Sequence, residues 1–149
     1  MNKDDYVKLL KDFVDFLTKK GISVVGCNRE QISSLEEKQG NLSEFYKLYL
    51  KYMGVNPGDF RIGSAMLFSD LNDINEETLV LMCDNNIIPP TGIFTFLMHQ
   101  GYASLFFTDR DSEDSKIYCY TEYEEIADIS YTFSSYLECE IKNHKSFKE

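Results

Sequence analysis

The chain of 149 residues contains no tryptophan and only two histidines, and its four cysteines include no C-x-x-C pair. Scattered cysteines of this kind favour neither a zinc site nor a disulfide scaffold, and we expect Cys83 and Cys119, inside apolar runs, to be small buried hydrophobes. His99 and His144 have no H-x-x-x-H or H-E-x-x-H spacing. A catalytic Cys–His pair formed by His99 and one of the cysteines would have a spacing that matches no recognisable signature. We therefore expect no catalytic set, no metal and no cofactor.

Long apolar runs are also missing. The longest are far shorter than the roughly 20 residues that span a bilayer. The first residues, Met1 to Tyr6, lack the basic and then apolar regions of a signal peptide. Together with the scattered cysteines, these absences predict a protein of the reducing cytoplasm.

Basic residues are few relative to acidic ones. Lys and Arg number 15 against 25 Asp and Glu, giving a formal net charge of −10. Nucleic acid and anionic membranes both require a basic surface, so neither is an expected partner. The charge suits a basic protein partner, although it also suits solubility alone.

The acidic excess is concentrated between residues 109 and 140, where Arg110 and Lys116 are the only bases. Two acidic segments, 109–114 and 122–128, flank a strand of about six residues and are expected near its opposite ends, about 20 Å apart. The functional interpretation is a surface that steers a basic partner and imitates its polyanionic substrate. A solvated hairpin and, more weakly, a calcium loop are the alternatives. The candidate partner-binding carboxylates are Asp109, Asp111, Glu113, Asp114, Glu122, Glu124 and Glu125.

The stretch from Ile93 to Tyr120 predicts the centre of the fold. Its aromatic and β-branched runs are broken by a turn at residues 99–101, where we place His99, and by another at 109–115. Turns this short join antiparallel strands, so the stretch predicts a meander. A further strand is expected at 62–68, and 122–129 is expected to be an acidic connection.

Helical periodicity covers most of the remaining chain. A first helix is predicted from residue 2 or 4 to 20, and a second begins at Asn28 with Gln31 completing a capping box. A third runs from its N-cap, Ser43, to Gly54. Asp73 and Glu76 suggest a capping box for a fourth, which Ile74, Leu79, Val80, Met82 and Cys83 outline.

A final helix is predicted to begin near Thr132, followed by a frayed polar tail over residues 142–149. Helices first, then an antiparallel sheet, then a closing helix describe one α+β domain over residues 1–149.

The run ISSLEEKQGNLSEFYKLYL, from Ile32 to Leu50, resembles the opening motif of the SMI1/KNR4 (SUKH) superfamily. That motif joins a helix ending in Gly to a Leu-Pro that begins an aromatic-rich helix. Here Ser43 stands in the place of the Pro, and both residues suit a helix start. The later order of strands, acidic hairpin and final helix is also similar, so the resemblance covers roughly 29–137.

The resemblance implies an immunity protein, since bacterial members of the superfamily bind and neutralise toxin domains, often nucleases, encoded nearby. Fungal members imply a regulatory scaffold as the alternative, and an enzyme is a third possibility. Tyr46 and Tyr49 of the aromatic-rich helix are added to the candidate partner-binding residues, because Tyr is enriched at binding hot spots. Core packing is the other reading of these tyrosines. The oligomeric state stays open.

Overall fold

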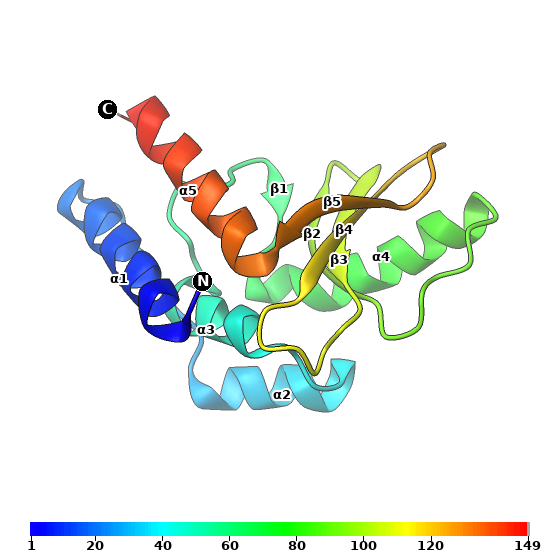
Figure 1. The fold of residues 1–149 in the computed structure, drawn as a ribbon, viewed down its shortest axis with the longest axis horizontal. Coiled ribbons are helices and arrows are strands. Elements are labelled where there is room, and N and C mark those ends of the chain that lie inside the picture. The colour runs from blue at the N-terminus through cyan, green and yellow to red at the C-terminus, as the bar shows by residue number, and fades with distance from the viewer. Residues whose placement is uncertain (149) are drawn as a thin grey trace.

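A computed structural model describes residues 1–148 of the chain, and their side chains as far as residue 146. It is a single α+β domain with helices first, a sheet, and a closing helix, as the sequence predicts (Figure 1). The elements are α1 (Lys3–Lys19), α2 (Arg29–Gln39), α3 (Glu44–Met53), β1 (Ser64–Ala65), the 3-10 helix η1 (Phe68–Asp70), α4 (Leu71–Asp84), β2 (Phe94–His99), β3 (Ala103–Phe107), β4 (Lys116–Thr121), β5 (Ala127–Thr132) and α5 (Phe133–Lys148).

The sheet is an antiparallel meander with the strand order β1-β2-β3-β4-β5. Its three central strands confirm the meander predicted from residues 93–120. Two expectations at its edges are wrong. The strand expected at 62–68 shrinks to two residues before η1, and the connection expected at 122–129 contains the first half of β5. A tight turn at 121–124 brings the chain straight back, so β5 pairs with β4.

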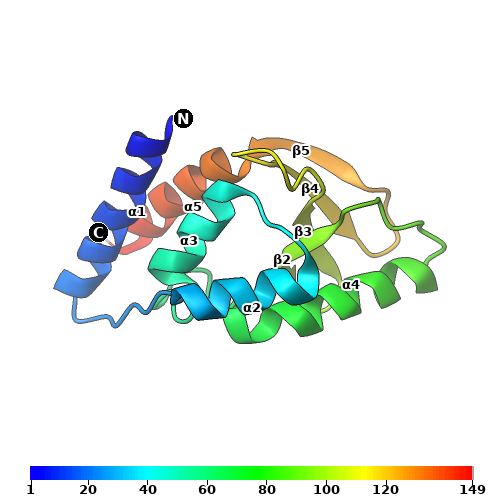
Figure 2. The same cartoon turned by 90° about the horizontal axis from the view of Figure 1, so that it is seen from below.

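Helices cover the two faces of the sheet differently. Phe96 and Phe107 point to the side of α3 and α5, where they meet Tyr46 and Phe133. Phe106 and Ser104 point to α4, where Phe106 joins the cluster around Met82. Figure 2 shows α4 along one side of the sheet and α1, α3 and α5 gathered on the other.

The first helices begin where their capping residues predict. The Asn2 side chain accepts from the Asp5 N–H at 2.8 Å at the start of α1. At α2, Asn28 and Gln31 form the predicted reciprocal capping box at 2.8 and 2.9 Å. At α3, Ser43 is at the N-cap position but its side chain makes no capping bond.

The fourth helix differs from its prediction at its start and on its buried face. It begins at Leu71, after η1, so Asp73 is inside it rather than at its cap. Leu79, Val80 and Cys83 are exposed. Ile74 and Met82 are buried as predicted, and the polar residues Asn75 and Thr78 lie beside them on the buried face.

Hydrogen bonds explain why two polar residues lie on the buried face of α4. The Asn75 amide donates to the Thr95 carbonyl at 2.9 Å and accepts from the Thr95 N–H at 2.8 Å. Thr78 shares hydroxyl bonds with Thr95 and Ser104 at 3.0 and 3.1 Å. These contacts satisfy groups on β2 that have no neighbouring strand, as buried polar atoms require.

The last helix continues through the segment expected to be frayed. α5 runs to Lys148, and position 149 lies outside the described residues. His144 holds the helix to the loop before β1, where its ring nitrogen is 3.0 Å from an Asp59 oxygen. Phe13 and Phe60 pack edge-on against the same ring.

Candidate functional site

Tyr46 and Tyr49 are core residues, each only 1% exposed, so the expectation that they contact a partner is wrong. α3 lies between α1, α5 and the sheet, and its aromatic side chains therefore meet protein on every side. The Tyr46 ring contacts Phe94, Phe107 and Phe133. Burial raises the pKa of both tyrosines well above its ordinary value.

The first acidic segment, 109–114, forms a turn that holds helix ends in place. The Glu113 carbonyl accepts from the Phe45 N–H of α3 at 3.0 Å, which replaces the bond that Ser43 does not make. The Asp114 carboxylate accepts from the Ser134 N–H of α5 at 2.9 Å. Asp111 accepts from the Asn41 side chain at 2.7 Å. These bonds give the turn a structural role, most clearly at Asp114.

Arg110, in the same turn, fastens it to two other parts of the chain. Its guanidinium donates to the carbonyls of Gly92 and Ile93 at 2.7 and 2.8 Å, and also to those of Gln39 and Asn41. Burial lowers the pKa of this guanidinium. The Arg110 cation therefore donates its hydrogen bonds to backbone carbonyls rather than to the carboxylates of the acidic turn.

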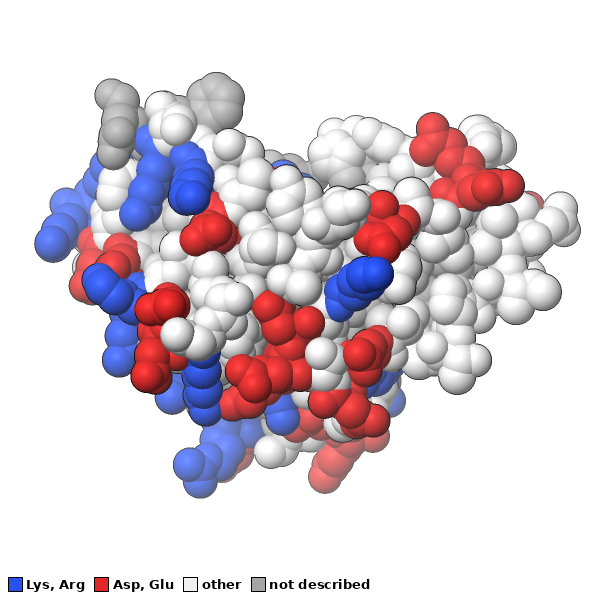
Figure 3. Space-filling view, in the orientation of Figure 1, with Lys and Arg blue, Asp and Glu red and all other residues white. Residues whose placement is uncertain are grey.

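The second acidic segment lies at the opposite end of β4, as the sequence predicts. Glu122, Glu124 and Glu125 belong to the turn between β4 and β5, about 20 Å along the strand from the first segment. Among the acidic side chains that Figure 3 shows, those over the loop between β3 and β4 lie apart from those at the hairpin tip at upper right. The two segments do not form one continuous patch.

Tyr123 is the most prominent feature of the hairpin tip. It is 86% exposed and has a φ of 71°, a left-handed conformation that suits glycine better than tyrosine. The Glu124 N–H closes the turn on the Thr121 carbonyl at 2.9 Å. Non-glycine residues in this conformation are concentrated at functional sites. An exposed tyrosine between carboxylates is therefore a candidate contact.

The outer face of α4 adds carboxylates that we did not predict as site residues. Glu76, Glu77 and Asp84 are exposed there and line a hollow that also contains Gly101 of the β2–β3 turn. That turn touches the hairpin tip, because the Glu122 N–H donates to the Tyr102 carbonyl at 2.8 Å. We call this region the acidic end. It comprises Glu76, Glu77, Asp84, Glu122, Glu124 and Glu125.

The two stretches of sequence that supply the acidic end lack Lys and Arg as well as containing its carboxylates. No Lys or Arg occurs between Arg61 and Arg110, or between Lys116 and Lys142. The sequence therefore contained a signal for this surface, in the two base-free intervals that meet in space. In Figure 3, basic side chains gather on the α1 side, and the hairpin tip carries acidic ones alone.

Ion pairing is found elsewhere in the domain. Pairs join Lys3 to Glu44 at 2.7 Å, Arg61 to Glu140 at 3.2 Å and Lys116 to Asp128 at 3.1 Å, among others. Among the residues that the structure describes, none of the six carboxylates of the acidic end has a basic nitrogen within 4.0 Å. Their mutual repulsion is therefore uncompensated within the described chain.

The histidines occupy positions different from those expected. His99 ends β2 rather than lying in a turn, and its Nδ1 is 3.3 Å from the Ser64 hydroxyl. No carboxylate bond to this ring is present in the described residues, so the pair lacks the third group that orients a catalytic histidine. Within those residues, no group of three or more His, Cys, Asp or Glu side chains could hold a metal ion.

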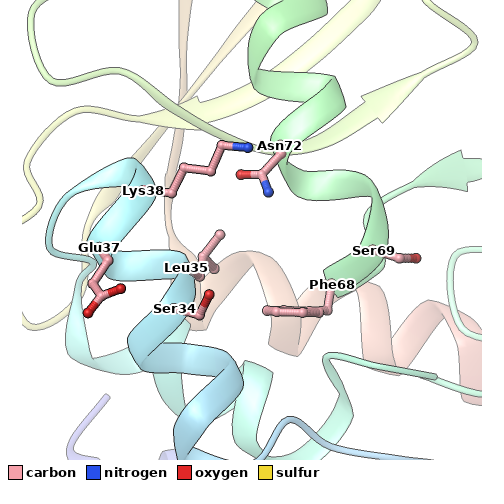
Figure 4. A pocket seen from close by; sticks show the side chains of 7 residues that line it. All are labelled: Ser34, Leu35, Glu37, Lys38, Phe68, Ser69 and Asn72. Carbon is pink, nitrogen blue, oxygen red and sulfur yellow. The ribbon is translucent and has the colours of Figure 1, made fainter.

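A second hollow, of about 370 Å³, lies between α2 and the start of α4. Figure 4 shows Lys38 extending towards Asn72 above Leu35 and Phe68. The Asn72 amide oxygen accepts from Gln39 at 2.7 Å. Only Glu37 and Lys38 of its lining can carry charge, and the full lining is Ser34, Leu35, Glu37, Lys38, Phe68, Ser69 and Asn72. Within the described residues, no hydrogen bond joins Ser34 or Ser69 to Lys38, so the lining lacks a nucleophile bonded to a base.

No protein-family model and no curated protein matches the chain. Among the helices described, none combines the length and the hydropathy needed to cross a bilayer.

Proposed function

We propose that this protein is a binding module whose acidic end holds a basic protein, and that this partner is a toxin domain which the protein neutralises as an immunity protein. The observation that carries the binding mode is the group of six exposed or half-exposed carboxylates, none of which has a basic nitrogen within 4.0 Å in the part of the chain that the structure describes. The toxin class rests on the resemblance of residues 32–50 to the SUKH motif. A regulatory scaffold would use the same surface with another basic partner.

Electrostatics gives such a surface two effects. Its field steers an oppositely charged protein into an encounter and can raise the association rate by about 10- to 1000-fold at low salt. A basic partner also relieves the repulsion among the carboxylates of α4 and the hairpin tip. Both effects weaken as salt is added, since the screening length falls to roughly 8 Å near physiological ionic strength.

Occlusion would follow from charge imitation. A nuclease needs a basic cleft for its polyanionic substrate, and carboxylates projecting from a tip with Tyr123 can occupy such a cleft. Binding of this kind is stoichiometric and requires no turnover, metal or cofactor. It places the protein in the cytoplasm, together with the nucleic acid that the toxin would cut.

The test is a kinetic binding measurement against the basic C-terminal toxin domain encoded beside this chain. We expect one-to-one binding whose association rate falls with salt. The acidic-end variant E122Q/E124Q/E125Q should lower that rate about tenfold at low salt. The matched variant D109N/D111N/E113Q removes the same charge from the turn at the other end of β4 and should have a smaller effect.

Other outcomes would contradict parts of the proposal. Equal losses in both variants would show that net charge, rather than the acidic end, governs association. Tight binding that ignores salt and both variants would move the interface to another face. Absence of binding would rule out this toxin as the partner and leave the scaffold function.

A further inference from the structure

Val80 occupies the centre of the outward face of α4. Glu76 and Glu77 lie one turn before it and Asp84 one turn after, at the spacings that share one face of a helix. Val80 is 58% exposed, although this central position would ordinarily be polar on a solvated helix. An aliphatic side chain ringed by unpaired carboxylates is an unusual arrangement for a surface that contacts only water.

A groove opens beside Val80, between α4 and the turn that joins β2 to β3. Its volume is about 410 Å³, within the range of roughly 300–1,000 Å³ typical of ligand pockets. Val80, Leu81 and Met98 supply its apolar surface, and Gly101 forms the opposite wall. Met98 is buried, so the base of the groove is apolar and its rim is acidic.

The wall of the groove formed by the β2–β3 turn is low, because the turn is tight and Gly101 has no side chain. Gln100 and Gly101 both have positive φ, at 48° and 77°, in a tight three-residue connection that a bond from the Tyr102 N–H to the His99 carbonyl closes. Apart from Gly101 itself and its two chain neighbours, no described residue has a heavy atom within 4 Å of the place where a Cβ on Gly101 would be. The groove is therefore open above this turn, and a side chain can enter it from solvent.

We propose that this groove receives one large apolar side chain from a basic amphipathic helix of the partner. This proposal rests on the proposed function and names the part of the partner that binds. Glu76 and Asp84 are eight residues apart on α4, which corresponds to about 12 Å along the axis. A partner helix with Lys or Arg about one turn before and one turn after the apolar residue matches that span.

Charge complementarity selects this occupant over two others. A second copy of the chain, docked through the same face, would bring Glu76, Glu77 and Asp84 against their own equivalents. An anionic lipid surface would meet the same repulsion. A helix that is basic around one apolar residue avoids both costs and buries Val80.

The experiment uses a synthetic helical peptide of about five turns with Leu at its centre and Lys on both flanks. A second peptide replaces only that Leu with Ser. Each is titrated into the full chain, with the methyl NMR signals of Val80 and Met98 as the local readout. We expect the Leu peptide to shift both signals and to bind about tenfold or more tightly than the Ser peptide.

Two protein variants separate the groove from the helix that bears it. Val80→Ser should remove most of the advantage of the Leu peptide. Leu79→Ser changes a neighbouring exposed side chain outside the groove lining and should leave the affinity unchanged. Both positions are exposed, so neither change should unfold the domain.

The outcomes distinguish this proposal from the proposed function. Equal binding of the two peptides without methyl shifts would overturn the groove and leave a purely electrostatic acidic end. Absence of peptide binding would also overturn the groove. The proposed function would then stand or fall on the toxin-domain measurement, which does not depend on Val80.

Discussion

Asp114, in the loop between β3 and β4, caps the last helix, which begins at the end of the neighbouring strand β5. Its carboxylate accepts from both the backbone N–H and the hydroxyl of Ser134, at 2.9 and 2.5 Å, twenty residues further along the chain. The preceding residue, Glu113, accepts from the Phe45 N–H through its carbonyl. Adjacent residues of one acidic turn thus cap the start of α5 and the start of α3. Among the described residues, the side chains of the acidic end cap no helix.

Removing this cap should affect stability more than binding. Asp114→Ala leaves the Ser134 N–H without its partner, and we expect a loss of about 1–2 kcal/mol of unfolding free energy. Glu113→Ala keeps the carbonyl that caps α3 and should change stability little. Urea denaturation of the two variants measures the difference. Equal stability of both would contradict the capping role of the Asp114 carboxylate.

The two bases beside the acidic turn should behave differently. Arg110 donates to carbonyls of residues far apart in sequence, and a lysine cannot reproduce that planar fork. We expect Arg110→Lys to cost about 2–3 kcal/mol, because several carbonyls, those of Gln39 and Ile93 partly buried, lose a charged donor. Lys116 forms only an exposed pair with Asp128, so Lys116→Ala should leave the thermal midpoint nearly unchanged. A similar midpoint for both variants would show that the Arg110 bonds are dispensable.

Buried tyrosines divide by whether the hydroxyl has a partner. The Tyr6 hydroxyl donates to the Phe45 carbonyl at 2.6 Å, whereas those of Tyr46 and Tyr49 have no hydrogen-bond partner among the described residues. Tyr6→Phe should therefore cost about 1 kcal/mol, and Tyr46→Phe should be neutral or stabilising. Chemical denaturation of each variant checks the order. A larger loss at Tyr46 than at Tyr6 would indicate a partner, such as a bound water, for that hydroxyl.

Stability should fall in alkali because of the same side chains. Burial raises the pKa of Tyr6, Tyr46, Tyr49 and Tyr136 in the folded protein. Above a pH of about 10 the unfolded chain loses these protons while the folded chain keeps them, so the unfolded state is favoured as pH rises. Tyrosinate absorbance and circular dichroism, followed together, should show the buried tyrosines ionising only as the fold is lost. Full ionisation of all ten tyrosines in a folded protein would contradict this.

Local signals predicted much of the fold, and long-range bonds account for the errors. The Asn28–Gln31 capping box and the apolar runs of β2 to β4 depend on neighbouring residues, and both were predicted correctly. The buried face of α4 was predicted correctly only at Ile74 and Met82, because Asn75 and Thr78 are satisfied by Thr95, which is distant in sequence. The His144 contact with Asp59 that holds α5 down is equally non-local.

The candidate site was predicted in part for a similar reason. The hairpin carboxylates Glu122, Glu124 and Glu125 form a dense local run, and the structure leaves them without ion-pair partners among the described residues. Glu76, Glu77 and Asp84 are separated from them in sequence by the three strands β2 to β4. The two sets are linked in space by the β2–β3 turn, which lines the hollow beside α4 and contacts the hairpin. Composition alone could not distinguish Asp114, whose carboxylate caps a helix, from carboxylates that form no ion pair or capping bond within the described residues.

Cysteine reactivity gives an independent view of the acidic end. Cys83, expected to be buried, is exposed on α4 one turn after Val80, whereas Cys27 is buried and its pKa is raised to about 11 by desolvation. At pH 8 only about one Cys27 thiol in a thousand would be a thiolate, so Cys83 should react first with iodoacetamide and Cys27 last. Mass spectrometry of timed samples measures the order. Faster labelling of Cys27 than of Cys83 in the folded protein would contradict the burial of one or the exposure of the other.

A partner bound across α4 should slow the labelling of Cys83 specifically. Cys139, which lies on α5 away from the acidic end, serves as the internal reference for alkylation. We expect a saturating toxin domain to reduce the Cys83 rate severalfold and to leave the Cys139 rate unchanged, because covering an exposed thiol blocks access without altering its neighbours on α5. Protection of Cys139 with Cys83 still reactive would place the partner on the α5 side and contradict binding at the groove of α4.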